Sequence, residues 1–133
     1  MKYQKKMKKK ADPKEIGIPN INFSIDLTNE KDERNELFKQ QRLERGFDDS
    51  ELWNLDMTFV EFMLPRIKRF REVHCGYPGR LTDKKWNKIL DEIIKGFELY
   101  KEFAYDVSLS PEQGKQINKA FKLFSQYIYD MWD

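Results

Sequence analysis

Apolar residues that recur at helical spacing are the feature that most limits how this chain can fold. Steps of three and four residues place side chains on one face of a helix. Only residues 16–27 alternate with the period of a strand, and a lone strand has no partner to pair with. The sequence therefore predicts an all-α protein. The two clearest helical rows are Trp86, Ile89, Leu90, Ile93, Ile94 and Phe97, and Ile117, Phe121, Phe124, Ile128 and Met131.

Start and stop residues predict four helices. The first is expected to begin at Asp26 or Thr28 and to end at Arg45, because Gly46 is a favourable C-terminal stop. A third helix is expected after Thr82, fading over residues 103–107. The fourth has the strongest start, since Ser110-Pro111-Glu112-Gln113 combines an N-cap, a first-turn proline and a capping-box partner.

The second helix is expected to be central. Asp48, Asp49 or Ser50 is its predicted cap, and the residues from Leu52 to Leu64 are apolar on several faces. Pro65 is expected to kink or break this helix, because proline lacks a donor and clashes one turn back. A short basic helix would then reach His74. Within the third helix, Gly96 is expected to allow a close helix approach.

The chain of 133 residues is the size of one domain, with a heavily charged surface. Six lysines lie in residues 1–10, and since the whole chain carries +2, the remaining 123 residues sum to −4. We expect a flexible basic arm and extended segment over residues 1–27 and a helical domain over 28–133. The predicted architecture is an irregular four-helix bundle with an extended, basic N-terminal arm.

The single cysteine, Cys75, cannot form an internal disulfide, which favours a reducing compartment such as the cytoplasm. No apolar run reaches the roughly 18 residues that span a membrane, and no secretory signal is recognisable at the start. We therefore expect a cytoplasmic protein with no membrane partner.

Two basic groups are candidates for nucleic-acid or phosphate contact. Lysines on a flexible arm can contact phosphates without fixed geometry, and arginine offers a planar fork for phosphate oxygens. The alternatives are a solubilising tail and a solvated helix face balanced by Glu72, Asp83 and Asp91. The candidates are Lys5, Lys6, Lys8, Lys9 and Lys10 on the arm, and Arg66, Lys68, Arg69 and Arg71 on the helix, with Tyr77, Arg80, Lys84 and Lys85 beyond it.

The string Trp53-Asn54-Leu55-Asp56 places Asn54 and Asp56 within an apolar stretch. If buried, these polar groups must be hydrogen-bonded, for example to Arg66 or to a helix end. Trp53, Asn54 and Asp56 are therefore predicted as structural polar contacts, with a role in partner binding as the alternative.

Carboxylates form two further groups, which we interpret as solvated faces. Helical bundles that hold two irons use Glu-x-x-His pairs, whereas this chain has the single histidine His74 in another spacing. We predict no catalytic residue, no metal and no cofactor. The two groups are Asp48, Asp49, Glu51 and Asp56, and Glu98, Glu102 and Asp106.

Several strings within residues 46–98 resemble a family of small, uncharacterised helical proteins common in tailed phages and prophages. The resemblance implies phage origin and a helical fold, and implies no activity. The strings are Gly46-Phe47-Asp48-Asp49-Ser50-Glu51, Trp53-Asn54-Leu55-Asp56, Leu64-Pro65-Arg66-Ile67-Lys68-Arg69-Phe70, Gly76-Tyr77-Pro78, Leu81-Thr82-Asp83-Lys84-Lys85-Trp86 and Ile89-Leu90-Asp91.

Together these features predict a small phage-encoded accessory protein that binds a protein partner and has no catalytic activity. The aromatic-rich last helix, ending at Trp132, would expose an apolar strip for that partner or for a second copy. A nucleic-acid-binding protein using the arm and residues 66–71 is the alternative. A metal-dependent enzyme using the carboxylates is the second alternative.

Overall fold

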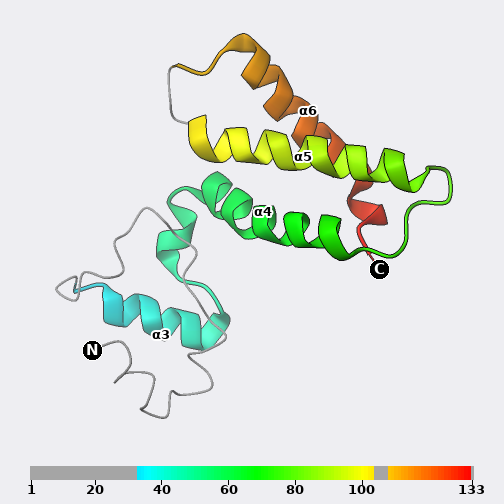
Figure 1. The fold of residues 1–133 in the computed structure, drawn as a ribbon. Coiled ribbons are helices and arrows are strands. Elements are labelled where there is room, and N and C mark those ends of the chain that lie inside the picture. Colours follow the sequence, from blue (N-terminus) through cyan, green and yellow to red (C-terminus); the bar gives the residue numbers. More distant parts are fainter. Residues whose placement is uncertain (1–32, 104–107, 133) are drawn as a thin grey trace, which may run out of the picture. The chain divides into compact units, whose positions relative to one another are not determined.

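The computed structural model describes residues 33–103 and 108–132 (Figure 1). Within them lie four α-helices, and no strand occurs, which confirms the predicted all-α fold. Two short 3-10 helices, Asp49–Leu52 and Ile128–Asp130, precede α4 and follow α6. The arm, residues 1–27, lies outside the described residues. The α-helices are α3 (Asn35–Arg45), α4 (Leu55–Val73), α5 (Asp83–Phe103) and α6 (Pro111–Tyr127).

The chain divides into two compact units, residues 1–58 and 59–133, with the boundary inside α4. In the first unit, α3 ends as predicted. Gly46 has a φ of 86°, and its N–H donates to the Arg42 carbonyl at 2.9 Å. The start differs from prediction, because a turn at residues 33 and 34 precedes α3, which begins at Asn35 without a side-chain cap. The predicted caps Asp26 and Thr28 lie outside the described residues.

A buried carboxylate organises the segment after α3. Asp48 accepts from the Ser50 N–H at 2.9 Å, from the Ser50 hydroxyl and from the Arg42 guanidinium at 2.6 Å. Glu51 completes a capping box by accepting from the Asp48 N–H at 2.7 Å. The predicted cap is thus confirmed, but it caps a 3-10 turn rather than a long helix.

The α-helix begins only at Leu55, three residues later than the apolar run suggests. In a continuous helix, the Leu55 N–H would donate to the Glu51 carbonyl. That carbonyl instead accepts from the Thr58 hydroxyl at 2.7 Å. A side chain therefore satisfies the group that would have joined the two helical segments.

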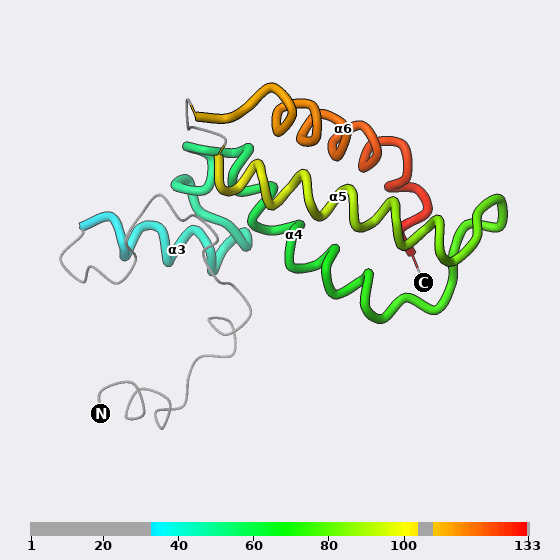
Figure 2. The backbone as a smooth tube through the Cα atoms, turned by 45° about the horizontal axis from the view of Figure 1, so that its top comes forward, coloured from blue at the N-terminus to red at the C-terminus, as the bar shows by residue number. Residues whose placement is uncertain are grey.

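In the second unit, α5 runs beside both α4 and α6 in the two views (Figures 1 and 2). All three helices contribute to one core, because each has apolar residues on the face that meets its neighbours. Burying a large apolar side chain stabilises by about 1.5–3 kcal/mol, so this cluster is the main source of stability in the unit. Its buried members are Val60, Leu64, Ile67, Ile93, Phe97 and Ala120.

The predicted central position of the segment from Leu52 to Leu64 is wrong for most of its apolar residues. Of the apolar side chains in this stretch, only Val60 and Leu64 are buried. Met63 packs against this core, and the Phe59 ring, although partly exposed, meets the rings of Phe97, Phe121 and Phe124. A helix meets its neighbours over a limited arc, and most of the remaining apolar side chains of the run are exposed. The exposed ones are Leu52, Trp53, Leu55, Phe59 and Phe62.

Pro65 lies inside α4, and the helix continues through it to Val73, so of the predicted kink or break the break does not occur. Proline removes one backbone donor and disturbs the carbonyls one turn earlier. The Arg66 guanidinium donates to the Phe62 carbonyl at 2.8 Å and lies 3.7 Å from the centre of the Phe62 ring. The carbonyl that lacks its helical donor because of Pro65 is that of Glu61, so the Arg66 bond is an additional contact to the carbonyl next to it.

Gly96 provides the predicted close approach, between α5 and α6. A Cβ atom at this position would lie 2.1 Å from the Ala120 Cβ and 2.9 Å from the Gln116 carbonyl oxygen. Carbon atoms pack at about 3.5–4 Å, so only glycine fits here.

The caps of α5 and α6 follow the sequence. The Thr82 hydroxyl accepts from the Lys85 N–H at 3.2 Å. The Ser110 hydroxyl accepts from the Gln113 N–H at 3.2 Å, and Gln113 accepts from the Ser110 N–H at 2.9 Å. The apolar row predicted for the fourth helix, from Ile117 to Met131, is shorter than expected. The helix α6 ends at Tyr127, and Ile128 is exposed.

None of the helices in the described part of the chain is long and apolar enough to cross a membrane.

Candidate binding site

The predicted basic segment of α4 is compensated by acidic residues. The Lys68 ammonium lies 2.7 Å from the Glu98 carboxylate, and the Arg71 guanidinium lies 3.0 Å from Asp91. Hydrogen bonding to Asp91 raises the pKa of Arg71. Both carboxylates lie on α5, and they neutralise two of the cations that the sequence predicted as phosphate contacts.

The remaining cations of the segment are engaged within α4 itself. Arg69 lies 3.0 Å from the Glu72 carboxylate, and Arg66 covers the Phe62 ring. The structure thus favours the alternative of a solvated face balanced by nearby acids. The arm lysines, from Lys5 to Lys10, lie outside the described residues.

One member of the predicted carboxylate row of α5, Glu98, takes part in the ion pairs between α4 and α5. Glu98 pairs with Lys68, and a further pair joins Lys101 to Glu61 of α4 at 3.2 Å. Glu102 is exposed, and Asp106 lies outside the described residues. In residues 33–103 and 108–132, no group of three or more His, Cys, Asp and Glu side chains is arranged to hold a metal ion.

The Trp53-Asn54-Leu55-Asp56 string lies at the turn before α4. The Trp53 ring is half exposed and meets Phe38 edge-on at 5.9 Å, with the Arg34 guanidinium 5.2 Å from it. Asn54 is partly buried and its carbonyl accepts from the Thr58 N–H at 2.9 Å, whereas Asp56 is exposed. Trp53 therefore has a packing role in the first unit, and a partner-binding role for the string stays a prediction.

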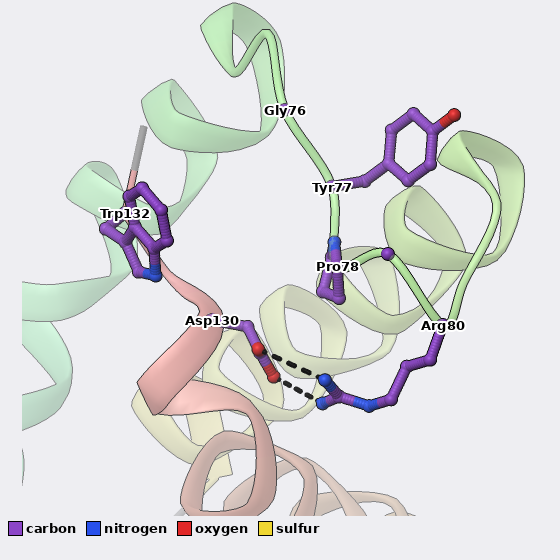
Figure 3. Close-up of a pocket in the computed structure, with 7 residues that line it drawn as sticks. Gly76, Tyr77, Pro78, Arg80, Asp130 and Trp132 are labelled. Atoms are coloured by element: carbon purple, nitrogen blue, oxygen red, sulfur yellow. Dashed lines mark hydrogen bonds and ion pairs between the residues drawn. The ribbon is translucent and has the colours of Figure 1, made fainter.

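A different site is formed where the α4–α5 loop meets the C-terminal segment (Figure 3). It is a pocket of about 280 Å³, lined by the loop residues 76–80 together with Asp130 and Trp132. The loop turns at Pro78, whose carbonyl accepts from the Leu81 N–H at 2.8 Å. Residues 50 positions apart in the chain are thus brought together.

His74 anchors the start of this loop. Its Nδ1 lies 2.8 Å from the Gly76 carbonyl oxygen, and its Nε2 lies 2.6 Å from Asn87 Oδ1 on α5. The Asn87 amide is oriented in turn by the Asp83 carboxylate, which accepts from its Nδ2 at 3.4 Å. The histidine therefore has a structural role and holds the loop against the first turns of α5.

An ion pair joins the loop to the C-terminal segment at the pocket. The Arg80 guanidinium donates to both Asp130 oxygens, at 2.6 and 3.4 Å. The bond to Asp130 raises the pKa of Arg80, so the arginine is held as a fixed cation. The Asp130 side chain is 19% exposed and that of Arg80 is 62% exposed, which leaves guanidinium N–H groups accessible.

Two aromatic residues that line the pocket, and a third next to Asp130 in the chain, are exposed. Tyr77 is 50% exposed, Tyr129 is 83% exposed and Trp132 is 77% exposed. Within the described part of the chain, none of them contacts another ring or makes a side-chain hydrogen bond. Figure 3 shows Trp132 on the Asp130 side of the pocket, whereas the Tyr77 ring projects away from it.

Sequence reasoning identified part of this site. Tyr77 and Arg80 were predicted within a basic face, and Trp132 within an exposed apolar strip. Asp130 was not predicted, because nothing in the sequence links it to Arg80. The density of aromatic residues at Tyr127, Tyr129 and Trp132 was the available signal.

Comparisons of the chain with protein-family models, with curated proteins and with solved structures found no match.

Proposed function

We propose that this chain is a small phage-encoded accessory protein of the host cytoplasm that acts by binding a protein partner through the Trp132 pocket. The name denotes the pocket lined by residues 76–80, Asp130 and Trp132. The resemblance of residues 46–98 to small phage proteins supports the origin.

The exposed aromatic rings are the observation that carries this proposal. Tyrosine and tryptophan are enriched among the residues that dominate protein interfaces, since they bury much area at little entropic cost. Tyr77 and Trp132 are exposed and line a formed pocket, Tyr129 is exposed and precedes Asp130 in the chain, and none of the three rings contacts another ring among the described residues. Exposed apolar patches beside a pocket commonly mark interaction sites, and Trp132 gives this pocket such a wall.

The test is affinity capture from cells that express the full chain, after nuclease treatment. We expect a protein that the wild type retains and that Tyr77→Ala/Trp132→Ala retains at least tenfold less. Lys122→Ala, which removes an exposed charge from α6, is the matched control and should retain the same protein. Equal retention by the double variant, or loss on nuclease treatment alone, would contradict the proposal.

Nucleic-acid binding is the second candidate, and the six lysines among residues 1–10 favour it. If all six contact phosphates, affinity for DNA or RNA should fall by about a thousandfold between 50 and 200 mM salt. Deletion of residues 1–10 should abolish the binding, as measured by fluorescence anisotropy. Absence of binding by the full chain at 50 mM salt would remove this candidate.

A further inference from the structure

We infer that one face of α5 and α6 binds the phosphate backbone of a nucleic-acid duplex without reading its base sequence. This inference rests on the nucleic-acid candidate above, and it adds a folded surface to the contacts expected from the arm. We name this surface the lysine face. Its members, all of them exposed, are Lys84, Lys88 and Lys95 of α5 and Lys115, Lys119 and Lys122 of α6.

The lysines form two rows on neighbouring helices, which run side by side in both views (Figures 1 and 2). Within each row the steps are of three, four or seven residues, which keeps the side chains on one side of the helix. Glu92 lies between the rows, with its carboxylate 3.6 Å from the Lys119 ammonium. The pKa of Glu92 is lowered mainly by the hydrogen bond from Gln116, and further by Lys119 and Lys95. Lysines of both rows therefore lie close to the same carboxylate.

Two carboxylates of α5 are engaged with α4 rather than with these lysines. Asp91 lies 3.0 Å from the Arg71 guanidinium, and Glu98 lies 2.7 Å from the Lys68 ammonium. The packing of α4 against α5 thus uses acids that would otherwise balance the exposed lysines of α5.

Most of the lysine face is left without an ion-pair partner. Its two pairs are Lys119 with Glu92 and Lys115 with Glu112, the latter at 3.9 Å. Glu102, exposed and seven residues after Lys95, is a third acid at the end of the α5 row. Six lysines therefore meet three carboxylates, and a polyanion is the partner that this surplus of positive charge attracts. The lysines that form no ion pair with a described residue are Lys84, Lys88, Lys95 and Lys122.

The side chains around these lysines favour a duplex over other polyanions. The exposed large apolar side chains of the described chain all lie outside α5 and α6. Protein interfaces depend on buried aromatic anchors and are depleted in lysine, and membrane-bound helices insert apolar side chains. Single strands are held by bases that stack on aromatic rings. A duplex needs none of these, because its bases are already stacked and its phosphates face outward.

The kind of cation indicates contact with phosphate rather than with bases. Neither α5 nor α6 contains an arginine, the residue whose planar fork most often reads guanine, whereas lysine is a compact charge on a flexible stem. Seven residues of helix, as from Lys88 to Lys95, span about 10 Å, which equals about three base pairs along a duplex. Each row can thus reach more than one phosphate.

The test measures the binding of the full chain to a short labelled duplex by fluorescence anisotropy between 50 and 200 mM salt. Lys88→Gln/Lys95→Gln/Lys122→Gln should weaken binding at least tenfold at 50 mM salt. It should also reduce the slope of log affinity against log salt by about 2–3, because three phosphate contacts are lost. Two unrelated base sequences should bind the wild type equally. DNA and RNA duplexes are measured in parallel, and the tighter one identifies the ligand.

The matched control removes the same charge from residues that are ion-paired. Lys68→Gln/Arg69→Gln/Lys101→Gln should change the affinity less than threefold, since these cations already have the partners Glu98, Glu72 and Glu61. The indole resonance of the buried Trp86 checks that both variants are folded.

The inference is overturned if the lysine-face variant binds the duplex as tightly as the wild type, or if the control loses as much. Tighter binding of a single strand also overturns it, as does binding of polyglutamate or of phosphatidylserine vesicles with the same dependence on the three lysines. If the wild type binds the duplex and only deletion of residues 1–10 weakens it, the lysine face is excluded and the arm candidate stands. Absence of binding at 50 mM salt removes both.

Discussion

Gly96 is the residue whose identity the tertiary structure restricts most directly. Adding one methyl group places it 2.1 Å from the Ala120 Cβ, so Gly96→Ala must push α6 away from α5. Overpacking costs about 1–3 kcal/mol, against a gain in helix propensity of about 1 kcal/mol. We expect Gly96→Ala to lower the free energy of unfolding by about 1–2 kcal/mol, measured by urea denaturation.

Gly114 provides the matched control for this substitution. It lies in α6 with no atom within 4 Å of its added Cβ, so Gly114→Ala should stabilise by about 0.5–1 kcal/mol through helix propensity alone. Combining Gly96→Ala with Ala120→Gly should destabilise less than the two single changes summed, because the pair shares one contact. Equal effects of Gly96→Ala and Gly114→Ala would show that the close approach is absent in solution.

At the scale of the element, the start of α6 depends on its capping box. The Ser110 hydroxyl satisfies the Gln113 N–H at 3.2 Å, a donor that the helix itself leaves unpaired. Ser110→Ala should therefore reduce stability by about 1 kcal/mol in urea denaturation. Ser125→Ala, an exposed change within the same helix, should have almost no effect, and a comparable loss there would refute the capping explanation.

A second prediction for the elements concerns pH, through the contact of α5 with α6. The Gln116 amide donates to Glu92 at 2.7 Å and lowers the pKa of that carboxyl, with a smaller contribution from Lys119. A carboxyl whose pKa is lower in the folded state stabilises above its unfolded pKa, and this contribution is lost as the pH falls through the folded pKa.

Glu92→Gln should accordingly be less stable than the wild type at pH 7 and nearly equal to it at pH 3, in paired urea titrations. Glu102→Gln removes an exposed charge from the same helix and should show a smaller difference at pH 7. A Glu92→Gln deficit that persists unchanged at pH 3 would mean that shape rather than charge matters at this contact.

At the scale of the whole molecule, the second unit has a core of its own. Every buried member of its cluster, from Val60 to Ala120, lies within residues 59–133. A fragment of residues 55–133, which keeps α4 entire, should therefore fold and unfold cooperatively. The expected readout is an indole resonance of Trp86 at the same position as in the full chain.

Trp86 is suited to this measurement because it is fully buried in the second unit, where its ring meets those of Phe70 and Tyr127. The Trp132 resonance serves as an internal reference, since that side chain is exposed in either case. A collapsed amide spectrum of the fragment would show that residues 1–54 are needed for the second unit to fold.

Much of the fold was predictable because helices are specified locally. Three of the predicted helix ends depend on hydrogen bonds between residues at most four positions apart. They are the stop at Gly46, the start after Thr82 and the capping box at Ser110. The close approach at Gly96 was also anticipated, although its partner Ala120 was not.

The candidate sites were predicted less well, because surfaces depend on which helix faces meet. Lys68 and Glu98 appear as separate basic and acidic candidates in the sequence, yet they neutralise each other at 2.7 Å. Trp132 was identified from the aromatic residues near it in the sequence. The Arg80–Asp130 pair was not predicted, because its two residues are 50 positions apart.

The amino-acid sequence by itself determined which segments are helical, the end of α3, the starts of α5 and α6, and that the fold is all-α. The physical reason is that caps and periodic apolar rows act over one or two helical turns. Tertiary structure alone decided which face of the run before Pro65 is buried, which charges remain uncompensated, and that residues 76–80 and Trp132 form one pocket. These outcomes depend on contacts between distant segments, whose geometry no local pattern encodes.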